Sequence, residues 1–558
     1  MAGAADEERC WVEGCRGARF GGTPECFAHL GDDARAKALS KLHSGADVDL
    51  RDTELTDALL RQLLRAVRND DGDGNPELGS ARFDGARFTD RADFADVTFT
   101  GRARFVGSHW GDADFHGAVF AGSASFDDAV FDGKALFRNA RFEDGGHFWR
   151  CRFHGATTFF GAVFTGTAAF ARCTFADGAS FADMQAKDVV ESREMSFEQG
   201  ADFTGTTFEQ AGRLGPLRSP GTVTFDRCLF SQPVTIDADV DQLSFIGARF
   251  ADTAVLRLQR TRLWLDGAIL QGTTTVVSAD IPPPDEDDVA PENPGPDPVP
   301  LHERELPLGS GSVVALRGVD AGKVVLSGVD LSRCRFRGAY NLDKLRIQGR
   351  CRFADTPRGV RLGWGWLPVW WWTRRQTIVE EHRWRSRRPR RTEGWSSEYP
   401  TRPGGTIGWG QPTHAEGLAA IYRQLRKAFE DAKDEPGAAD FYYGEMEMRR
   451  LSPTTPRSER LVLTLYWLFS GYGLRASRAL LGLVGLVAVT TLLLTTRGFV
   501  APGTGVEEAL RSALNAVVFR TSTESLTTTG AYTEMVARLF GPILLALAVL
   551  SVRNRVKR

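Results

Sequence analysis

The hydrophobic positions between Ala81 and Met184 recur every five or six residues, and nearly all of them are phenylalanine. The residue two places before each of these aromatic residues is small, most often alanine. An α-helix repeats every 3.6 residues and a β-strand every 2.0, so neither explains this period. A short strand followed by a corner does, because residues two apart in a strand point to the same side. The pattern therefore predicts a solenoid in which each repeat buries its apolar face against its neighbours.

The segments "ARFDGARFTD" and "AVFDGKALFRNARF" resemble the repeats of pentapeptide-repeat proteins. In that family a small residue, a polar residue and a central Phe or Leu are followed by two more polar residues. The resemblance implies a right-handed quadrilateral β-helix, with four repeats in each coil and the central residues stacked along its axis. In this chain spacings of five and six mostly alternate. The alternation predicts an extra corner residue in every second repeat and about 22 residues per coil, with coils about 4.8 Å apart.

The repeats weaken toward the C-terminal side but return, so we expect one β-helix domain over 80–355. Within it, the segment 280–307 holds nine Pro and nine carboxylates and is expected to be a disordered excursion. Five cysteines take the small inward position of a repeat, namely Cys151, Cys173, Cys228, Cys334 and Cys351. Cysteine acts there as a compact hydrophobic residue, so we expect these five to be buried and reduced, as in a cytoplasmic protein.

Four metal-ligating residue types fall within twenty positions near the N-terminus, with the spacing C-x4-C-x10-C-x2-H; they are Cys10, Cys15, Cys26 and His29. Tetrahedral zinc takes four nitrogen or sulfur ligands and needs no large core. The pattern predicts a structural Cys3His zinc knuckle over 1–30, and the alternative is three buried thiols beside an unrelated histidine. Residues 31–79 are expected to form a helical cap, with Thr56 as the N-cap of its second helix.

The net charge of −2 excludes a chain-wide electrostatic attraction to nucleic acid. Nucleic acid is therefore not expected as a partner. The first residues are acidic and lack an apolar core, so no secretory signal peptide is expected. Tryptophan and arginine are concentrated in the linker 356–412. Its candidate interface residues are Trp370, Trp371, Trp372, Arg374, Arg375, Arg387, Arg388, Arg390 and Arg391. We favour contact with anionic lipids, while nucleic-acid contact and simple packing against the solenoid remain alternatives.

The segment 413–452 is expected to be a helical hairpin broken at Pro436–Gly437, with its carboxylates on a solvated face. An aromatic, amphipathic stretch at 457–478 is suited to lying along a bilayer surface. Two apolar runs follow, Ala479–Thr496 and the shorter Leu539–Val552, so that 479–558 is expected to hold two transmembrane helices. Basic residues flank the outer ends of this pair, which places both chain ends and the bulk of the protein in the cytoplasm.

The sequence between the two apolar runs resembles the pore region of two-helix potassium channels. Thr527, Thr528, Thr529 and Gly530 match the start of the filter pattern, which implies a re-entrant pore-like loop. The match then fails, because Ala531 stands in place of Tyr and Tyr532 in place of the second Gly. Since that Gly permits the backbone conformation that aims carbonyls into a pore, selective conduction is not expected.

These features together predict a non-enzymatic bacterial inner-membrane protein that acts as a scaffold or protein-interaction module on the cytoplasmic face. The expected partners are membrane lipids, an unidentified protein and a second copy of the chain. One alternative is an oligomeric channel with a degenerate filter. Another is a membrane-associated redox enzyme, which no C-x-x-C pair, dinucleotide motif or His-paired nucleophile supports.

Overall fold

The computed structural model divides into two compact units, with the boundary between Ala354 and Asp355, and each is described by itself. The residues that the structure describes are 9–68, 74–281, 310–357, 360–361, 370–371, 375–387, 394–395, 414–500, 505–520 and 525–556.

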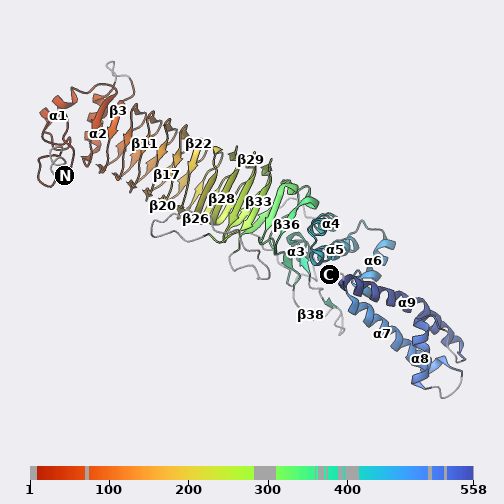
Figure 1. Ribbon diagram of the computed structural model, residues 1–558. Coiled ribbons are helices and arrows are strands. Elements are labelled where there is room, and N and C mark those ends of the chain that lie inside the picture. Colours follow the sequence, from red (N-terminus) through yellow and green to blue (C-terminus); the bar gives the residue numbers. More distant parts are fainter. Residues whose placement is uncertain are drawn as a thin grey trace. The chain divides into compact units, whose positions relative to one another are not determined.

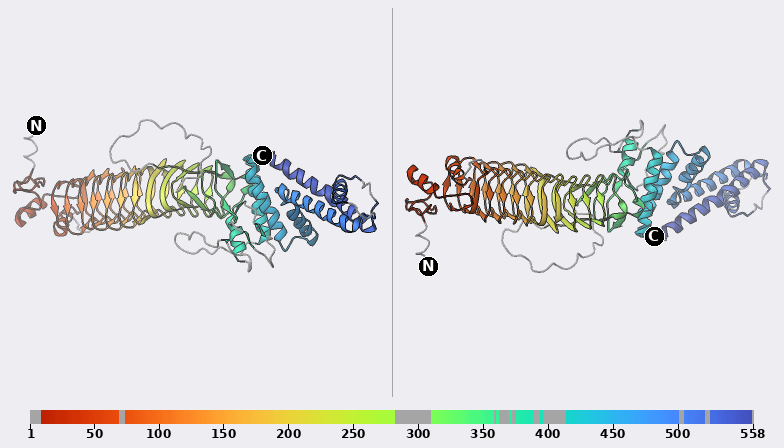
Figure 2. Two further views of the ribbon diagram at one scale, coloured as in Figure 1. Left: turned by 90° about the horizontal axis from the view of Figure 1, so that it is seen from below. Right: turned by 90° about the horizontal axis from the view of Figure 1, so that it is seen from above.

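The first unit is a β-solenoid whose coils are built from four short strands each (Figure 1). One coil consists of β6 (Thr98–Phe99), β7 (Ala103–Arg104), β8 (His109–Trp110) and β9 (Ala113–Asp114). These strands pair in parallel, in this order, with β10 (Val119–Phe120), β11 (Ala124–Ser125), β12 (Val130–Phe131) and β13 (Ala135–Leu136) of the next coil. Four ladders therefore run along the rod, one on each face, and this confirms the predicted four-sided architecture. Figure 2 shows the stacked coils of the rod from two further sides.

The aromatic repeat residues fill the interior and stack on one another from coil to coil. The rings of Phe83 and Phe105 are 5.0 Å apart at an angle of 6°, and those of Phe105 and Phe126 are 4.7 Å apart at 10°. All three side chains are fully buried. The chain separations of 22 and 21 residues confirm the predicted coil length. Each buried phenylalanine contributes about 1.5–3 kcal/mol relative to an exposed one, so the stack is the main stabilising feature of the rod.

Two kinds of corner alternate along the rod. After Phe83, Phe94 and Phe105, a residue two positions later takes a left-handed conformation; these are Gly85, Asp96 and Gly107, with φ of 67°, 56° and 64°. Glycine and, at lower frequency, Asp and Asn tolerate this conformation. The following repeat is the longer one in the first two cases, with six residues from Phe88 to Phe94 and from Phe99 to Phe105, and its corner is an open bend. The alternation of spacings therefore reflects two corner geometries, as the sequence predicted.

The solenoid begins earlier than residue 80. Strand β1 (Ala46–Asp49) pairs with β3 (Glu77–Arg82), and β2 (Glu54–Leu55) pairs with β4 (Arg87–Phe88), so the region expected to be only a helical cap already forms part of a coil. Two helices do occur there, α1 (Asp32–Leu39) and α2 (Asp57–Ala66). Helix α2 contacts β5 (Ala92–Asp93) and takes the place of the next strand of this first coil.

The N-cap prediction for α2 is confirmed. The Thr56 hydroxyl accepts a hydrogen bond from the Leu59 backbone N–H at 3.4 Å. The side chains of Leu60, Leu63 and Leu64 are buried, so the helix covers the apolar end of the stack. Closing this end removes the open cross-section that a solenoid would otherwise expose to water.

The ladders continue through the segments where the sequence pattern weakens. Strands β22 (Gln185–Glu191) and β23 (Met195–Phe197) stay in register, and β26 (Arg213–Thr224) and β28 (Val234–Ser244) are longer strands. The other strands of the rod are β14 (Arg141–Phe142), β15 (Gly146–His147), β16 (Arg152–Phe153), β17 (Thr157–Thr158), β18 (Val163–Phe164), β19 (Ala168–Ala169), β20 (Thr174–Phe175), β21 (Ala179–Ser180), β24 (Gly200–Asp202), β25 (Thr207–Gln210), β27 (Leu229–Phe230), β29 (Arg249–Phe250), β30 (Ala254–Leu258), β31 (Arg262–Trp264), β32 (Ile269–Leu270), β33 (Thr274–Ser278), β34 (Ser312–Ala315), β35 (Val324–Ser327) and β36 (Arg346–Gln348).

The acidic excursion predicted for 280–307 lies, from residue 282 onward, outside the described residues. On either side of it the ladder is unbroken, because β33 pairs with β35 over four residues in parallel. Within the solenoid, Cys151, Cys173, Cys228 and Cys334 are fully buried free thiols, whereas Cys351 is half-buried. The Cys151 and Cys173 thiols donate to backbone carbonyls at 3.0 Å and 2.7 Å. The expectation of a buried inward position is therefore confirmed for four of the five cysteines, and Cys351 departs from it.

The second unit is mainly helical. Two short strands, β38 (Val360–Arg361) and β39 (Trp370–Trp371), pair antiparallel, and β37 (Ala354–Asp355) and β40 (Gln376–Thr377) lie at its start. The helices are α3 (Val379–Ser386), α4 (Ala415–Asp431), α5 (Glu435–Leu451), α6 (Arg457–Ser470), α7 (Ala476–Leu493), α8 (Val506–Val517) and α9 (Thr528–Val556), with a π-helical turn at Leu494–Gly498.

Helices α4 and α5 form the predicted hairpin, but the break lies before Pro436. Helix α4 ends at Asp431 and α5 begins at Glu435, so Pro436 sits in the first turn, where no backbone N–H is needed. The Asp434 side chain caps α5 by accepting from the Gly437 N–H at 3.0 Å. Gly444 of α5 lies against the Tyr422 ring of α4, where an added Cβ would come within 2.5 Å of ring carbon. The two helices are therefore in close contact.

Candidate metal centre and apolar helices

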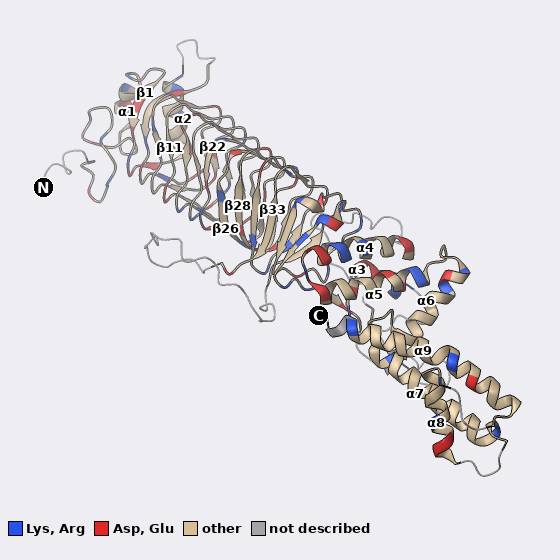
Figure 3. Ribbon diagram, turned by 45° about the vertical axis from the view of Figure 1, so that its right-hand side comes forward, with Lys and Arg blue, Asp and Glu red and all other residues tan. Residues whose placement is uncertain are grey.

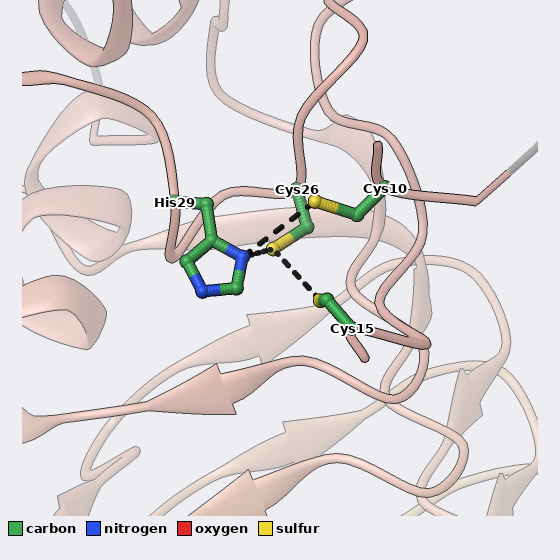
Figure 4. Close-up of side chains that lie close together, drawn as sticks. All are labelled: Cys10, Cys15, Cys26 and His29. Atoms are coloured by element: carbon green, nitrogen blue, oxygen red, sulfur yellow. Dashed lines mark hydrogen bonds between the residues drawn. The ribbon is translucent and has the colours of Figure 1, made fainter. Parts of the chain in front are cut away.

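The N-terminal cysteines and histidine come together as a compact cluster (Figure 4). The ligand atoms of Cys10, Cys15, Cys26 and His29 all lie within 4.8 Å of one another. The Sγ atoms of Cys15 and Cys26 are 3.7 Å apart, and the His29 Nδ1 lies 3.4 Å from Cys26 Sγ and 3.6 Å from Cys10 Sγ. The fold therefore brings all four predicted ligands to one point.

These separations match the edges of a zinc tetrahedron. With bonds of about 2.3 Å to sulfur and about 2.0 Å to nitrogen, tetrahedral angles place two sulfurs about 3.8 Å apart and a sulfur and a nitrogen about 3.5 Å apart. The three closest contacts, at 3.4 to 3.7 Å, agree with these lengths. The donor set and its geometry therefore fit zinc, with all four positions supplied by the protein, as in structural sites.

Two short antiparallel contacts hold the ligands in place. Arg9 bridges to Ala18, and Arg19 bridges to Cys26, so the segment folds back on itself. At Gly17 an added Cβ would lie 3.0 Å from the Cys26 Cβ, which is a tight contact, so glycine favours this close approach. The Ala18 N–H also donates to the Arg51 carbonyl at 2.9 Å, which ties the cluster to the first coil of the solenoid.

The thiols differ in acidity. Burial raises the pKa of the Cys26 thiol, and the neighbouring Cys15 thiol adds to the rise, to about 12. Burial also acts to raise the pKa of the Cys10 thiol, but hydrogen bonds from the Cys26 and Val12 backbone and the contact with His29 outweigh it and lower this pKa to about 7. A divalent cation would hold all three sulfurs as thiolates, because its charge offsets their mutual repulsion.

The predicted Trp/Arg interface is only partly described. Trp372, Arg374, Arg388, Arg390 and Arg391 lie outside the described residues, and of Trp370 and Trp371 only their place in β39 is described.

Two of the interface candidates have described side chains. Arg387 is exposed at the C-terminal end of α3, as an interfacial residue would be. Arg375 is not: its side chain is only 3% exposed, so in this structure it has no access to a lipid surface.

Arg375 instead belongs to a buried ionic network that the sequence pattern did not reveal. Its guanidinium donates to both carboxylate oxygens of Glu381 at 2.8 and 2.7 Å, and Arg385 donates to the same carboxylate at 2.6 Å. The Tyr422 hydroxyl donates to Glu381 as well. Burial acts to raise the pKa of Glu381, but Arg375 and Arg385 outweigh it and lower this pKa to about 2. The network joins α3 to α4.

The network continues into α5 and the turn after α6. The Glu447 carboxylate lies 2.9 Å from Arg450 and 3.5 Å from Arg385, and it accepts the Tyr472 hydroxyl at 3.0 Å. Glu445 is buried too, with both Arg423 and Arg426 at 2.9 Å. The prediction that these two helix carboxylates are solvated is therefore wrong for both. In sequence, the Glu381–Arg385 pair at the i,i+4 spacing and the Glu447–Arg450 pair at the i,i+3 spacing are the local signals of the network.

Among the described residues of the second unit, two helices are long and apolar enough to cross a membrane. They are Ala476–Gly498, with 23 residues, and Thr528–Arg553, with 26 residues, both of mean hydropathy 2.2. Only 17% and 28% of their most apolar windows are buried within the protein. Figure 3 shows few charged residues on α7 and α9. The second helix is longer than the predicted run Leu539–Val552, because α9 begins at Thr528.

The predicted pore-like loop is not a loop. Thr528, Thr529 and Gly530 form the first turn of α9, and Thr527 caps it, accepting from the Gly530 N–H at 3.1 Å. The Thr527 carbonyl accepts from the Ala531 N–H at 2.9 Å, as in a helix. These carbonyls are therefore used inside the helix and are not presented as a filter.

Gly530 has a packing role instead. An added Cβ at this position would lie 2.2 Å from the Gly498 carbonyl oxygen, so α9 approaches the end of the first apolar helix very closely here. The Thr527 N–H also donates to the Gly498 carbonyl, at 2.9 Å. The Thr-rich segment with its glycine thus serves a helix start and a tight helix contact.

The solenoid matches a known family of repeats. Residues 105–152 and 115–163 each match the family described as "Pentapeptide repeats (9 copies)". Both stretches lie within the coils that carry the phenylalanine stack. No curated protein matches the chain, and no solved structure matches it. Sequence and architecture thus point to the same kind of repeat.

Proposed function

We propose that this chain, a pentapeptide-repeat protein, is a non-enzymatic scaffold that its C-terminal apolar helices anchor in the cytoplasmic membrane. The observation that carries the proposal is the exposure of large apolar side chains on those helices. Leu481 and Leu492 of α7 are 71% and 63% exposed, and Leu539 and Val549 of α9 are 62% and 59% exposed. A core helix of a soluble protein would hide such residues, whereas lipid covers them at no cost in free energy.

The flanking residues support an orientation with both ends of the pair in the cytoplasm. Arg475 and Arg478 lie at the start of α7, and Arg553 lies near the end of α9. Basic residues at the outer ends of a transmembrane pair favour the cytoplasmic side. On α6, Leu461, Leu465 and Leu468 form an exposed apolar stripe, which suits a helix that lies along the same membrane surface.

The scaffold role rests on the composition of the described interior of the rod. Its buried residues are mainly phenylalanine, alanine, cysteine and aliphatic side chains, which pack against one another. The outward surface is left to bind partners, as in other solenoids. The oligomeric-channel alternative has no support from the Thr527–Gly530 segment, because its carbonyls are used within a helix.

Retention in the membrane tests the anchor. In full-length protein expressed in bacteria, we expect the wild type to stay in the membrane pellet after alkaline carbonate extraction. A Val484→Arg/Val489→Arg variant changes two exposed positions near the middle of the apolar helix Ala476–Gly498. It should lose this retention, because an arginine near the bilayer centre costs about 2.5–3.5 kcal/mol. The matched control is Val189→Arg/Ile269→Arg, which places the same charges on exposed apolar positions of the solenoid. Extraction of the wild type into the soluble fraction would refute the anchor.

We also propose that the Cys3His cluster holds a structural zinc ion. The protein, purified without chelators, should contain one zinc per chain by elemental mass spectrometry, and Cys15→Ser should lose it. We expect the loss to increase hydrogen exchange of the first coil, because a structural metal stabilises the segment that it binds. A Cys334→Ser variant, which alters a buried thiol of the rod, should keep its zinc. A folded wild-type protein without zinc would refute the site.

A further inference from the structure

A polar cavity lies on the surface of the last coils of the solenoid. Its volume is ≈ 300 Å³, and its walls include Arg262, Arg333 and Arg352 together with Asp330 and Ser312. Sites for small molecules measure roughly 300–1,000 Å³, so this cavity is at the small end of that range. It is large enough for an anionic group and part of the molecule that carries it.

Strand pairing brings these residues together although they are far apart in the chain. Arg262 pairs in register with Ser312, Ser312 bridges to Asp330, and Asp330 bridges to Arg352, all in parallel. Paired residues in a parallel ladder point to the same side, and adjacent strands are about 4.8 Å apart. Four successive coils therefore place an arginine, a serine, an aspartate and an arginine in one column along the wall of the cavity.

A β-bulge shapes the same wall. Leu263 pairs with Val313 and Trp264 pairs with Ala315, so Val314 is an extra residue in its strand. Val314 lines the cavity and packs against Trp264. Bulges redirect side chains and are frequent beside functional sites. The cavity thus coincides with a local departure from the regular repeat.

The charges on the wall differ from those on the rest of the rod. Elsewhere, arginines of one coil pair with carboxylates of an adjacent coil, as in Arg104–Asp84 at 3.1 Å and Arg150–Asp128 at 2.8 Å. Within the described part of the chain, Arg333 and Arg352 form no ion pair, and both are exposed. The excess positive charge at the cavity is therefore not neutralised from within the solenoid.

The other two charged groups of the wall, Arg262 and Asp330, interact with neighbouring residues of the solenoid. Arg262 contacts Asp241. The Asp330 Oδ1 accepts a hydrogen bond from the Ser332 backbone N–H at 2.7 Å, which fixes its orientation. Asp241 offsets the charge of Arg262, and Asp330 offsets one of the two charges of Arg333 and Arg352, so three arginines against two aspartates leave one net positive charge.

We infer that this cavity binds a phosphate-bearing ligand. A guanidinium group presents paired donors that match two phosphate oxygens, and hydrogen bonds between such charged groups are about twice as strong as neutral ones. Arg333 and Arg352 supply these donors. Asp330 is the unfavourable neighbour of a phosphate, so it limits the affinity.

Calorimetric titration of the full-length protein in an uncharged detergent tests this site, with glycerol 3-phosphate as the ligand and glycerol as the uncharged control. We expect Arg333→Gln/Arg352→Gln to weaken binding about tenfold or more, because both charge-assisted contacts are lost. Asp330→Asn should strengthen binding, since the amide oxygen can still accept the Ser332 N–H while the negative charge is removed. These two changes act in opposite directions, which general unfolding cannot produce.

A charge-matched control is Arg138→Gln/Arg141→Gln, which removes two exposed arginines from the middle of the rod. We expect it to bind like the wild type. Absence of binding by the wild type would overturn the inference, and so would equal binding by the Arg333/Arg352 variant. Such equal binding would mean that the phosphate is held elsewhere.

The phosphate could belong to a soluble metabolite or to a lipid headgroup, and a second titration separates the two. Dihexanoyl phosphatidic acid carries the same phosphate on a short-chain lipid. If it binds about as tightly as glycerol 3-phosphate, and both lose affinity in the Arg333/Arg352 variant, the ligand is a soluble phosphate. If it binds about tenfold more tightly or better, with the gain lost in that variant, the ligand is a lipid headgroup.

Discussion

Substitution of Glu381 by glutamine should increase local unfolding of α3, α4 and α5 in the second unit. The carboxylate is fully buried and accepts hydrogen bonds from Arg375, Arg385 and Tyr422. Glutamine keeps the shape but removes the charge. The buried Arg375 guanidinium then loses its carboxylate partner, while Arg385 keeps Glu447 at 3.5 Å. Removing one partner of a buried ion pair costs about 3–5 kcal/mol.

The lowered pKa of Glu381 gives a second, independent value for the free energy that the network contributes to stability. Its pKa falls from 4.5 to about 2, because Arg375 and Arg385 stabilise the charged form more than burial destabilises it. A difference of about 2.5 in pKa, at about 1.4 kcal/mol for each unit, amounts to about 3 kcal/mol of stability. Because the pKa is lowered on folding, this stability is present above pH 4.5 and is lost as the pH falls toward 2.

Hydrogen exchange of the full-length protein, read by mass spectrometry on peptides from α4 and α5, measures this opening. At neutral pH we expect Glu381→Gln to raise exchange about 100-fold, the equivalent of about 3 kcal/mol. Corrected for intrinsic rates, wild-type protection should fall between pH 4.5 and 2, and the variant should show a much flatter profile.

The control is Glu430→Gln on α4, where a half-exposed carboxylate pairs with Arg426 at 3.3 Å. Exposed pairs of this kind contribute about 0.3–0.5 kcal/mol, so its exchange should change little. If Glu381→Gln exchanged within about threefold of the wild type, the buried network would not be the element that holds these helices together.

Two further predictions concern close packing. Gly530→Ala should lower the stability of the helical unit to heat by about 1–3 kcal/mol, because its Cβ would meet the Gly498 carbonyl at 2.2 Å. The control is Gly485→Ala in α7, whose Cβ meets nothing within 4 Å and which should be neutral or stabilising. Equal effects of the two substitutions would contradict the close contact at Gly530. In the solenoid, Phe137→Ala should cost about 3–5 kcal/mol in denaturant unfolding followed by circular dichroism. Phe160→Ala, at a 42% exposed position, should cost far less, and similar losses at both sites would argue against the stacked core.

The solenoid could be predicted because its information is local and repeated. Each coil reuses the same small-polar-aromatic sequence, so period, corner type and inward face follow from any two neighbouring repeats. The first coil escaped prediction because its strands, such as Ala46–Asp49, carry no aromatic centre. Its backbone pairs with β3 all the same, since parallel ladders need no particular side chain.

Among the candidate sites, too, those built from residues close in sequence could be predicted and those built from distant residues could not. The metal cluster could be predicted because its four ligands lie within twenty residues of chain. The buried network could not, because Glu381 and Tyr422 are 41 residues apart and charged helix residues are usually solvated. The Thr527–Gly530 segment was assigned to a loop because its residue types suit a filter. The same types suit a capped helix start and a close helix contact, and only the three-dimensional partners distinguish the two.

The four-sided coil has a consequence for how such a chain can change its length. A deletion or insertion of one whole coil, about 22 residues, leaves every later strand on its own face. Loss of a single repeat would instead turn all later faces by a quarter of a revolution about the rod axis. The number of repeats that precede a residue therefore determines the face of the rod on which it lies. The direction in which the arginine-lined cavity faces, relative to the metal cluster at the other end of the rod, is set by how many repeats lie between them.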